Sequence, residues 1–366
     1  MPLITKKRKA KFFKTLKITR LPYLPFILGI EPGNICNLHC PLCPTGKNES
    51  GVTKGFIKFE LFKEIIDQLK DSLTTINLYN WGEPLLNKEF ISIITYTKQL
   101  NKDIRICTST NLNIRNNKLL EDLILSGIDE IIISCDGVSQ VTYEKYRRGG
   151  DFQLVVENMK FLVKKNKELN KNTLLVWNFL VFKHNEHEVK IAKEMAEKIG
   201  VVFRIGLMRT SMKDEILKPH EESIKQDIDW IPDNPDYSAY DKEKYRPKKI
   251  IKTCRKPWQE ISINWDGKVF ACCAIFGENF NFGDASKDSI INIWNNKLFI
   301  SARESILGKK IKINTICSLC KKNCANPALT DTKNRVQYPK EVSDEGAGKI
   351  YKRVQVRSDS LVRHRR

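Results

Sequence analysis

Short apolar runs alternate with amphipathic stretches from residue 28 to about residue 208. The runs at 28–32, 75–79, 104–108, 130–134, 174–182 and 201–207 are typical of strands. Between them, apolar residues recur at helical spacing, as at Leu61, Ile65 and Leu69, and the stripe at 188–199 ends at Gly200, a helix stop. Six strand–helix units predict a parallel sheet with right-handed crossovers and external helices. We expect strands this apolar to be buried on both faces, as in a TIM-like partial barrel of α/β class whose chemistry lies at the carboxyl ends of the strands.

The pattern changes after residue 208. Residues 209–250 are polar and contain four prolines, which indicates a linker or an excursion over the barrel mouth. Alternating residues on both sides of Asp266-Gly267 predict a hairpin, and a helix is expected over about 288–305. We therefore predict a basic extension (1–27), a partial (β/α)6 barrel (28–210), a linker (211–250), a small α+β domain (251–330) and a basic tail (331–366).

The formal net charge of +20 is concentrated at the two ends of the sequence. The first twenty residues contain no acid, and the sequence finishes Arg363, His364, Arg365, Arg366. Such runs attract phosphates of nucleic acid or an anionic membrane surface, although solvated ends of a lysine-rich protein explain them equally well. No stretch resembles a membrane span or a signal peptide, so a cytoplasmic location is the default expectation.

The eleven cysteines are clustered. Three lie between residues 36 and 43 and six between 254 and 324, whereas Cys107 and Cys135 lie in apolar runs typical of buried thiols. Without an export signal, clustered cysteines indicate metal binding rather than disulfides.

The first cysteine group follows the first predicted strand. Cys36, Cys40 and Cys43 have the spacing Cys-x3-Cys-x2-Cys, and three thiolates on one loop can hold three irons of a four-iron cluster. The missing fourth ligand leaves one iron open. The alternative is a zinc site with His39 as fourth ligand, but its position between two ligating cysteines makes that geometry awkward.

This loop resembles the signature of the radical S-adenosylmethionine (SAM) superfamily, and three further segments extend the resemblance. Trp81-Gly82-Glu83-Pro84 ends the second strand and is similar to the family's Gly-Gly-Glu-Pro motif, with Trp81 in place of the first glycine. Polar residues end the third and fourth strands, where the family contacts the SAM carboxylate and ribose. The resemblance thus implies SAM contacts from Gly82, Glu83, Pro84, Ser109, Asn111, Ser134 and Asp136.

The second cysteine group resembles the SPASM domain, or its shortened twitch form, which carries auxiliary clusters. The resemblance implies one auxiliary four-iron cluster held by Cys254, Cys272, Cys317 and Cys320. Cys324 is the substitute ligand, and Cys273 is expected on the opposite side of its strand. A structural zinc held by four thiolates is the alternative.

The resemblance implies a function in which an electron from the reduced first cluster cleaves SAM. The resulting 5′-deoxyadenosyl radical abstracts a hydrogen atom from a substrate carbon, and an external donor such as flavodoxin or ferredoxin supplies electrons. The single auxiliary cluster favours an oxidoreductase acting on a small hydroxylated or carbohydrate-like substrate, as twitch-bearing aminocyclitol dehydrogenases do. Arg204 and Arg209, at the end of the sixth strand, are the candidate catalytic residues.

Two alternatives remain open. Relatives with this layout also modify peptides, so a peptide maturase is the second hypothesis. The third comes from another class: a nucleic-acid-associated protein whose basic ends bind RNA and whose cysteine sites serve only structure.

Overall fold

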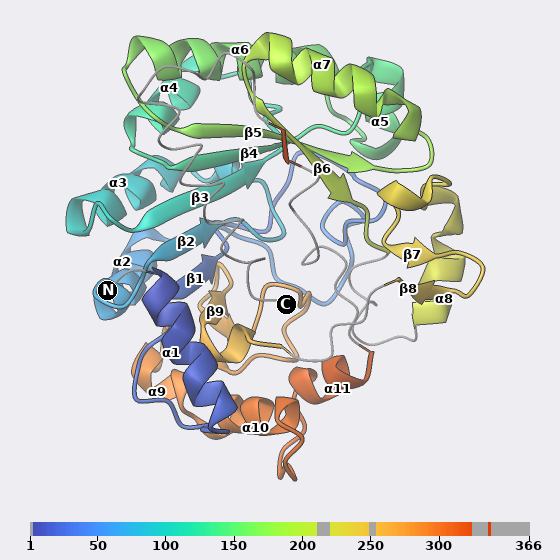
Figure 1. Cartoon of the computed structure of the whole chain (residues 1–366). Helices are drawn as coiled ribbons and strands as arrows, with labels where there is room; N and C mark the ends of the chain where they lie inside the picture. Colours follow the sequence, from blue (N-terminus) through green and yellow to red (C-terminus); the bar gives the residue numbers. More distant parts are fainter. Residues whose placement is uncertain (1–2, 211–219, 249–253, 324–335, 338–366) are drawn as a thin grey trace.

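The computed structural model describes residues 3–210, 220–248, 254–323 and 336–337 (Figure 1). Its first half contains α1 (Leu3–Thr15), β1 (Ile27–Ile30), α2 (Phe59–Leu69), β2 (Thr75–Leu78), η1 (Pro84–Leu86), α3 (Phe90–Leu100), β3 (Arg105–Thr110), α4 (Asn117–Leu125), β4 (Glu130–Ser134), α5 (Gln140–Tyr146), α6 (Phe152–Glu168), β5 (Leu174–Val181), η2 (Glu186–Glu188), α7 (Val189–Ile199) and β6 (Val202–Leu207). The remainder contains α8 (His220–Gln226), η3 (Ile228–Trp230), η4 (Pro235–Tyr237), β7 (Tyr240–Asp241), β8 (Arg246–Pro247), η5 (Lys256–Trp258), β9 (Glu260–Ile263), β10 (Lys268–Phe270), β11 (Gly283–Asp284), α9 (Ile290–Trp294), α10 (Lys297–Ile306), α11 (Ile316–Asn323) and β12 (Val336–Gln337).

Strands β1 to β6 are parallel neighbours in chain order, and helices α2 to α7 cover the convex side of the sheet (Figure 1). Each helix has an apolar face that packs on the sheet, as with Phe62 and Ile65 of α2. Gly200 ends α7 in the left-handed conformation, at φ 92°. The predicted α/β fold of strand–helix units in a partial barrel is confirmed.

The two faces of the sheet differ, which corrects the expectation that both are apolar and buried. Ile131 and Ile133 point to the helices and are fully buried. Their neighbours Glu130 and Ser134 point inward and are only half-buried. Ser134 aligns with Asn178 of β5, and Asn178 aligns with Arg204 of β6, so the concave face is polar. The strand sequences looked apolar because of their helix-facing residues, and these obscured the polar residues that alternate with them on the concave face.

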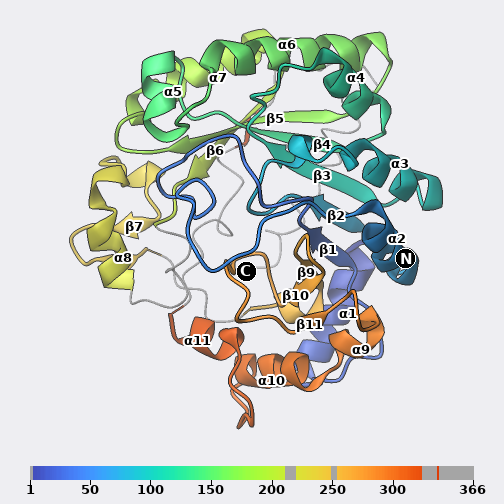
Figure 2. The same cartoon turned by 180° about the vertical axis from the view of Figure 1, so that it is seen from behind.

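The C-terminal hairpin belongs to the same sheet as the barrel strands. β9 pairs in parallel with β1, with Leu28 opposite Ile261, and β10 pairs antiparallel with β9 (Figure 2). Among the described residues the strand order is β11-β10-β9-β1-β2-β3-β4-β5-β6-β12. The predicted hairpin is present, but it extends the barrel sheet instead of forming a detached sheet. The domain boundaries themselves stay a prediction.

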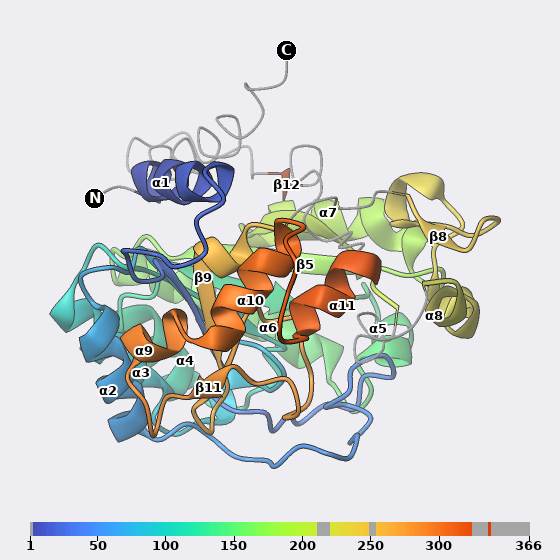
Figure 3. The same cartoon turned by 90° about the horizontal axis from the view of Figure 1, so that it is seen from below.

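Helix α1 occupies the end of the molecule opposite the long loop between β1 and α2 (Figure 3). Ala10 is buried against the core, and Lys6 donates to the backbone carbonyl of Ser72, just before β2. Phe12 and Leu16 are exposed. The sequence pattern did not reveal this helix because six of its thirteen residues are basic and its apolar residues form no clear stripe. No helix in the described parts of the chain combines the length and the apolar character needed to cross a membrane.

Glu31, directly after β1, joins the barrel to the C-terminal hairpin. Its side chain is 1% exposed and accepts from the backbone N–H of Trp81, at 3.2 Å, and of Trp265, at 3.4 Å. Burial raises the pKa of this carboxyl from 4.5 to about 7, although both hydrogen bonds oppose the shift.

The substitution Glu31→Gln is expected to remove a pH dependence of stability. Between pH 4.5 and about 7 the folded protein keeps a proton that the unfolded chain has released. The free energy of unfolding of the wild type should therefore fall across this range, by up to about 3 kcal/mol, and level off above it. Glutamine can accept a backbone hydrogen bond without titrating, so the variant should lack this fall in anaerobic urea unfolding. The exposed change Glu64→Gln on α2 is the control, and an equal fall in Glu31→Gln would contradict the assignment.

Candidate active site

The cysteine loop lies at the carboxyl end of β1 and is held in place by backbone contacts. The N–H of His39 donates to the carbonyl of Arg148 at 3.0 Å, and the N–H of Cys43 donates to the carbonyl of Cys40 at 3.1 Å. A Cβ on Gly46 would lie 2.5 Å from the backbone of Cys40, so only glycine permits this close approach. The loop is therefore shaped by the protein chain itself.

The donor set of this loop fits an iron–sulfur cluster. Cys40 is buried, Cys36 and Cys43 are half-buried, and all three belong to one apolar cluster of side chains. Burial raises the pKa of the Cys36 thiol to about 12, and the neighbouring thiols add to the effect, so iron must displace protons to bind. Soft thiolates in an apolar pocket suit iron–sulfur chemistry. Within the described residues, no three His, Cys, Asp or Glu side chains converge as ligands of one metal ion.

The segment 220–240 packs against this loop. Ile224 of α8, Ile231 and Tyr240 share an apolar cluster with Leu38 and Cys40. Residues 211–219 and 249–250 of the predicted linker lie outside the described residues. The described part of the segment therefore packs against one side of the cysteine loop, where its apolar side chains keep water away.

The loop Trp81-Gly82-Glu83-Pro84 is fixed by the Glu83 carboxylate. Glu83 is 2% exposed and accepts from the Thr110 hydroxyl at 2.7 Å and from the Asn111 N–H at 2.7 Å. A Cβ on Gly82 would lie 2.2 Å from the carbonyl oxygen of Gly33, so this glycine allows β2 to approach the cysteine loop. Pro84 begins η1. The carboxylate thus orders the loop, and the SAM contacts that the resemblance implies for Gly82, Glu83 and Pro84 stay predictions.

Trp81, the departure from the family motif, contacts the C-terminal region. Its indole N–H donates to the carbonyl of Ile275 at 3.0 Å, and its ring meets the edge of Phe276 with centroids 5.3 Å apart. The side chain therefore ties the predicted SAM-binding loop to the segment after β10. No local pattern predicts this role of Trp81, because the contact joins residues that are 194 positions apart in the chain.

The polar residues predicted at the ends of β3 and β4 come together. The hydroxyls of Ser109 and Ser134 lie 3.4 Å apart. The amide of Asn111 donates to Asn37 at 2.9 Å and lies 3.6 Å from the sulfur of Cys36. Asn111 therefore contacts the cysteine loop, Ser109 and Ser134 lie next to each other, and the SAM contacts of all three stay predictions.

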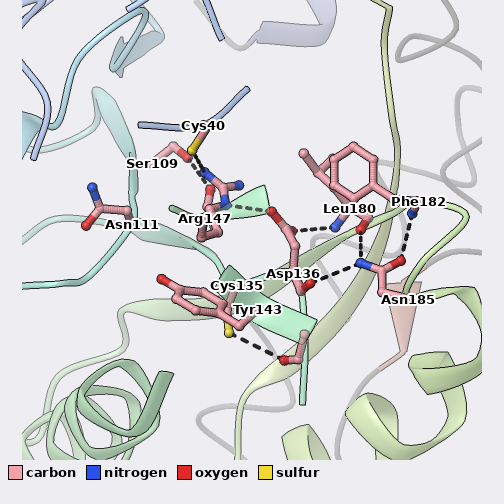
Figure 4. Close-up of polar contacts among 12 residues, drawn as sticks. Cys40, Ser109, Asn111, Cys135, Asp136, Tyr143, Arg147, Leu180, Phe182 and Asn185 are labelled. Carbon is pink, nitrogen blue, oxygen red and sulfur yellow. Dashed lines mark hydrogen bonds and ion pairs between the residues drawn. The ribbon is translucent and has the colours of Figure 1, made fainter. Parts of the chain in front are cut away.

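Asp136 is placed differently (Figure 4). It is fully buried, and its carboxylate accepts from Arg147 Nε at 2.5 Å and from the Leu180 N–H at 2.7 Å. Arg147 in turn directs Nη1 to the sulfur of Cys40 at 3.9 Å. The contact with SAM predicted for Asp136 stays untested, and the contacts observed here are with the protein. The sequence signal at Arg147 was a basic pair before two glycines, which suits a phosphate or carboxylate contact and did not indicate a contact with a cysteine.

Arg204 contributes to a polar network on the concave face. Its Nε donates to Asn178 at 2.9 Å, and Nη1 lies 3.9 Å from the Glu130 carboxylate. The same carboxylate pairs with Arg105 at 2.6 Å. Arg209 is half-buried, two residues beyond the end of β6. Both predicted catalytic residues therefore lie on or just after β6, and their roles stay predictions.

The predicted auxiliary ligands lie on elements that pack around η5 and α10. Cys254 precedes η5, Cys272 follows β10, and both α11 cysteines, Cys317 and Cys320, lie three residues apart on one helix face. Burial raises the pKa of Cys272 to about 12. Cys324 lies outside the described residues.

Cys273 differs from its neighbour Cys272. It is exposed, and its sulfur lies 3.7 Å from Nζ of Lys256. Lys256 also pairs with Glu260 at 2.5 Å, and its backbone N–H lies 3.4 Å from the sulfur of Cys254. A cation among these thiols suits an anionic cluster. Lys256 is a second residue that the sequence pattern did not single out.

Two family models and several known proteins are similar to this chain. The model of the radical SAM superfamily matches residues 30–195, and that of SPASM, an iron–sulfur cluster-binding domain, matches residues 254–325. A probable GTP 3′,8-cyclase of Methanococcus maripaludis is 29% identical over 213 residues, which cover 56% of this chain and 68% of that protein.

Two solved structures share the fold. BtrN in complex with AdoMet and 2-DOIA has a TM-score of 0.50 at 20% identity, covering 87% of this chain and 100% of that chain. Streptococcus suis SuiB bound to its precursor peptide SuiA has a TM-score of 0.59 at 14% identity, covering 88% of this chain and 77% of that chain. With both family models placed on the geometry described above, the chain belongs to the radical SAM superfamily and carries a C-terminal SPASM iron–sulfur cluster-binding domain.

Proposed function

We propose that this enzyme oxidises a small hydroxylated or carbohydrate-like substrate by removing a hydrogen atom from carbon. The observation that carries the proposal is the polar concave face of the sheet. Ser109 of β3 belongs to this face, and Asn111, directly after the same strand, contacts the cysteine loop. Hydroxyl, amide, carboxylate and guanidinium groups from Ser109, Ser134, Asn178, Glu130 and Arg204 offer donors and acceptors that match a hydroxyl-rich molecule.

Different residues of the chain would bind the cluster, SAM and the substrate. Cys36, Cys40 and Cys43 would hold the catalytic cluster, and the loop at Gly82 and Glu83 together with Ser109, Asn111 and Ser134 would hold SAM. When bound, these groups supply the reducing electron and the 5′-deoxyadenosyl radical that takes the hydrogen atom. The apolar side chains of segment 220–240 keep water from one side of the cysteine loop, and the concave face orients the target C–H bond.

Completing the oxidation requires the substrate to lose one proton and one further electron. Arg204 and Arg209 would bind an anionic or hydroxyl group of the substrate and stabilise the charge that forms as a proton leaves. Cys254, Cys272, Cys317 and Cys320 would hold the auxiliary cluster that accepts the electron, and an external carrier such as flavodoxin or ferredoxin would exchange electrons with the enzyme.

Peptide modification is the second candidate. Two observations favour it. SuiB, solved with its precursor peptide, shares the fold, and the described strands form an open sheet whose edge strands are β11 and β12. The cyclase relatives act, by name, on GTP, so a nucleotide also belongs among the substrates to be tested.

Binding of nucleic acid or an anionic membrane by the basic ends is a separate proposal, which a strong salt dependence of that binding would support.

The test of the proposed reaction is turnover under anaerobic, reducing conditions with polyols, aminocyclitols, GTP and ribosomal peptides. A true substrate should raise formation of 5′-deoxyadenosine above the uncoupled rate and lose two hydrogen atoms by mass spectrometry. Turnover of a peptide alone would replace the first proposal with the second. A cyclised, isomeric nucleotide without loss of hydrogen would contradict the oxidoreductase class.

Cysteine variants should separate the two clusters. Reconstituted wild type is expected to hold about eight irons, as two four-iron clusters require. Changing Cys36, Cys40 and Cys43 to alanine should leave about four irons and abolish 5′-deoxyadenosine formation. Cys272→Ala should also lower the iron content but retain SAM cleavage while substrate oxidation is lost. Cys135→Ala, a buried thiol outside both groups, is the control. SAM cleavage by the triple variant would contradict the cluster assignment.

Arg204→Gln should weaken substrate binding. The loss of a charged donor that works with Asn178 and Glu130 is expected to cost about 1.5 to 3 kcal/mol, a rise in KM of roughly tenfold to a hundredfold. The uncoupled cleavage of SAM should not change, because the substitution leaves the cysteine loop intact. Arg115→Gln removes an exposed arginine as the control. An unchanged KM would remove Arg204 from the substrate site.

A further inference from the structure

Arg147 is a buried cation beside the cysteine loop. It follows α5 directly, and its side chain is 13% exposed. On one side the guanidinium pairs with Asp136, and on the other its Nη1 lies 3.9 Å from the sulfur of Cys40 (Figure 4). The ring of Tyr146 lies 5.2 Å from its central carbon. A single cation thus connects the end of β4 to a cluster ligand.

The position of Arg147 is fixed by the groups behind it. Asp136 receives the Leu180 N–H on its second oxygen, and its backbone carbonyl accepts from the Asn185 amide at 3.0 Å. Asn185 is itself fully buried and accepts from the Phe182 N–H. The orientation of the guanidinium is therefore set by β5 and the loop after it, independently of the cysteine loop.

The apolar surroundings strengthen the electrostatic effect of Arg147 on the sulfur of Cys40. Cys40 is 6% exposed, and Leu38, Leu42, Tyr146 and Phe182 lie in the same apolar cluster. Water and salt screen a charge weakly in such a place, so a cation at 3.9 Å acts strongly on the sulfur.

We propose that Arg147, held by Asp136, is a positioning residue that raises the reduction potential of the cluster bound at Cys40. Reduction adds one negative charge to the cluster, and a fixed neighbouring cation stabilises that charge. Asp136 lies behind the guanidinium and partly offsets its field. The inference rests on the proposed binding of a catalytic cluster by Cys36, Cys40 and Cys43, and it is independent of the substrate.

The test is an anaerobic potentiometric titration of the reconstituted holoenzyme without SAM, followed by electron paramagnetic resonance. Arg147→Gln should lower the potential of the first cluster, by at least a tenfold change in its reduction equilibrium, which is about 59 mV for one electron. Asp136→Asn removes the offsetting anion and should shift the potential the opposite way. Arg147→Lys keeps the charge and should restore most of the wild-type value.

Two controls and one pair of fallback variants accompany this titration. Arg148→Gln removes the adjacent, exposed arginine and should leave the potential unchanged. The auxiliary cluster in the same sample should not shift in any variant. If Arg147→Gln fails to retain iron, Asp136→Asn and Arg147→Lys still give the sign and the charge dependence.

Opposite shifts from Arg147→Gln and Asp136→Asn at full iron content would support the proposal, because a purely structural role cannot reverse sign. Shifts in one direction, or none, would overturn it. Failure of the proposed function is distinguishable: it would appear as missing iron in the wild type or as absent 5′-deoxyadenosine, whereas failure of this inference leaves both intact.

Discussion

Glu31, Glu83 and Asp136 are buried carboxylates that follow β1, β2 and β4. Glu31 and Glu83 accept from backbone N–H groups of other loops on the rim, and Asp136 accepts from the Leu180 N–H in β5. A buried carboxylate is costly unless its oxygens are hydrogen-bonded, so each one forces two distant loops to meet. Glu31 brings Trp81 to Trp265, and Glu83 brings η1 to the end of β3. These contacts connect the loops of the rim to one another, in addition to the backbone hydrogen bonds that hold the cysteine loop.

This arrangement gives the cysteine loop a defined environment. The Glu83 loop and Gly82 press against its start, Asn111 contacts its first thiol, and Arg147 contacts its second. Segment 220–240 packs apolar side chains against one side of it. Radical chemistry needs a fixed target and little water. The contacts described here fix the cysteine loop from several strand ends.

Local patterns predicted much of this structure. The strands, the helix stop at Gly200 and the spacing of Cys36, Cys40 and Cys43 are short-range features that the sequence states directly. The pairing of strands far apart in the chain could not be predicted, because nothing in the residues of β9 indicates that its neighbour is β1. The polar concave face was missed because Glu130, Ser134 and Asn178 are interspersed among apolar residues that face the helices. Arg147 and Lys256 were missed because a lysine or arginine in a basic chain is ordinarily a surface residue.

The parallel pairing of β9 with β1 makes the two halves of the chain mutually dependent. A truncation before β9 would leave β1 as an edge strand, with its backbone N–H and C=O groups unpaired along one side. Exposed edges of this kind recruit strands from other molecules. Residues 254–323 are thus more than an accessory to the catalytic barrel: they complete it, and an ancestor that lost them would have had to seal the open edge by other means.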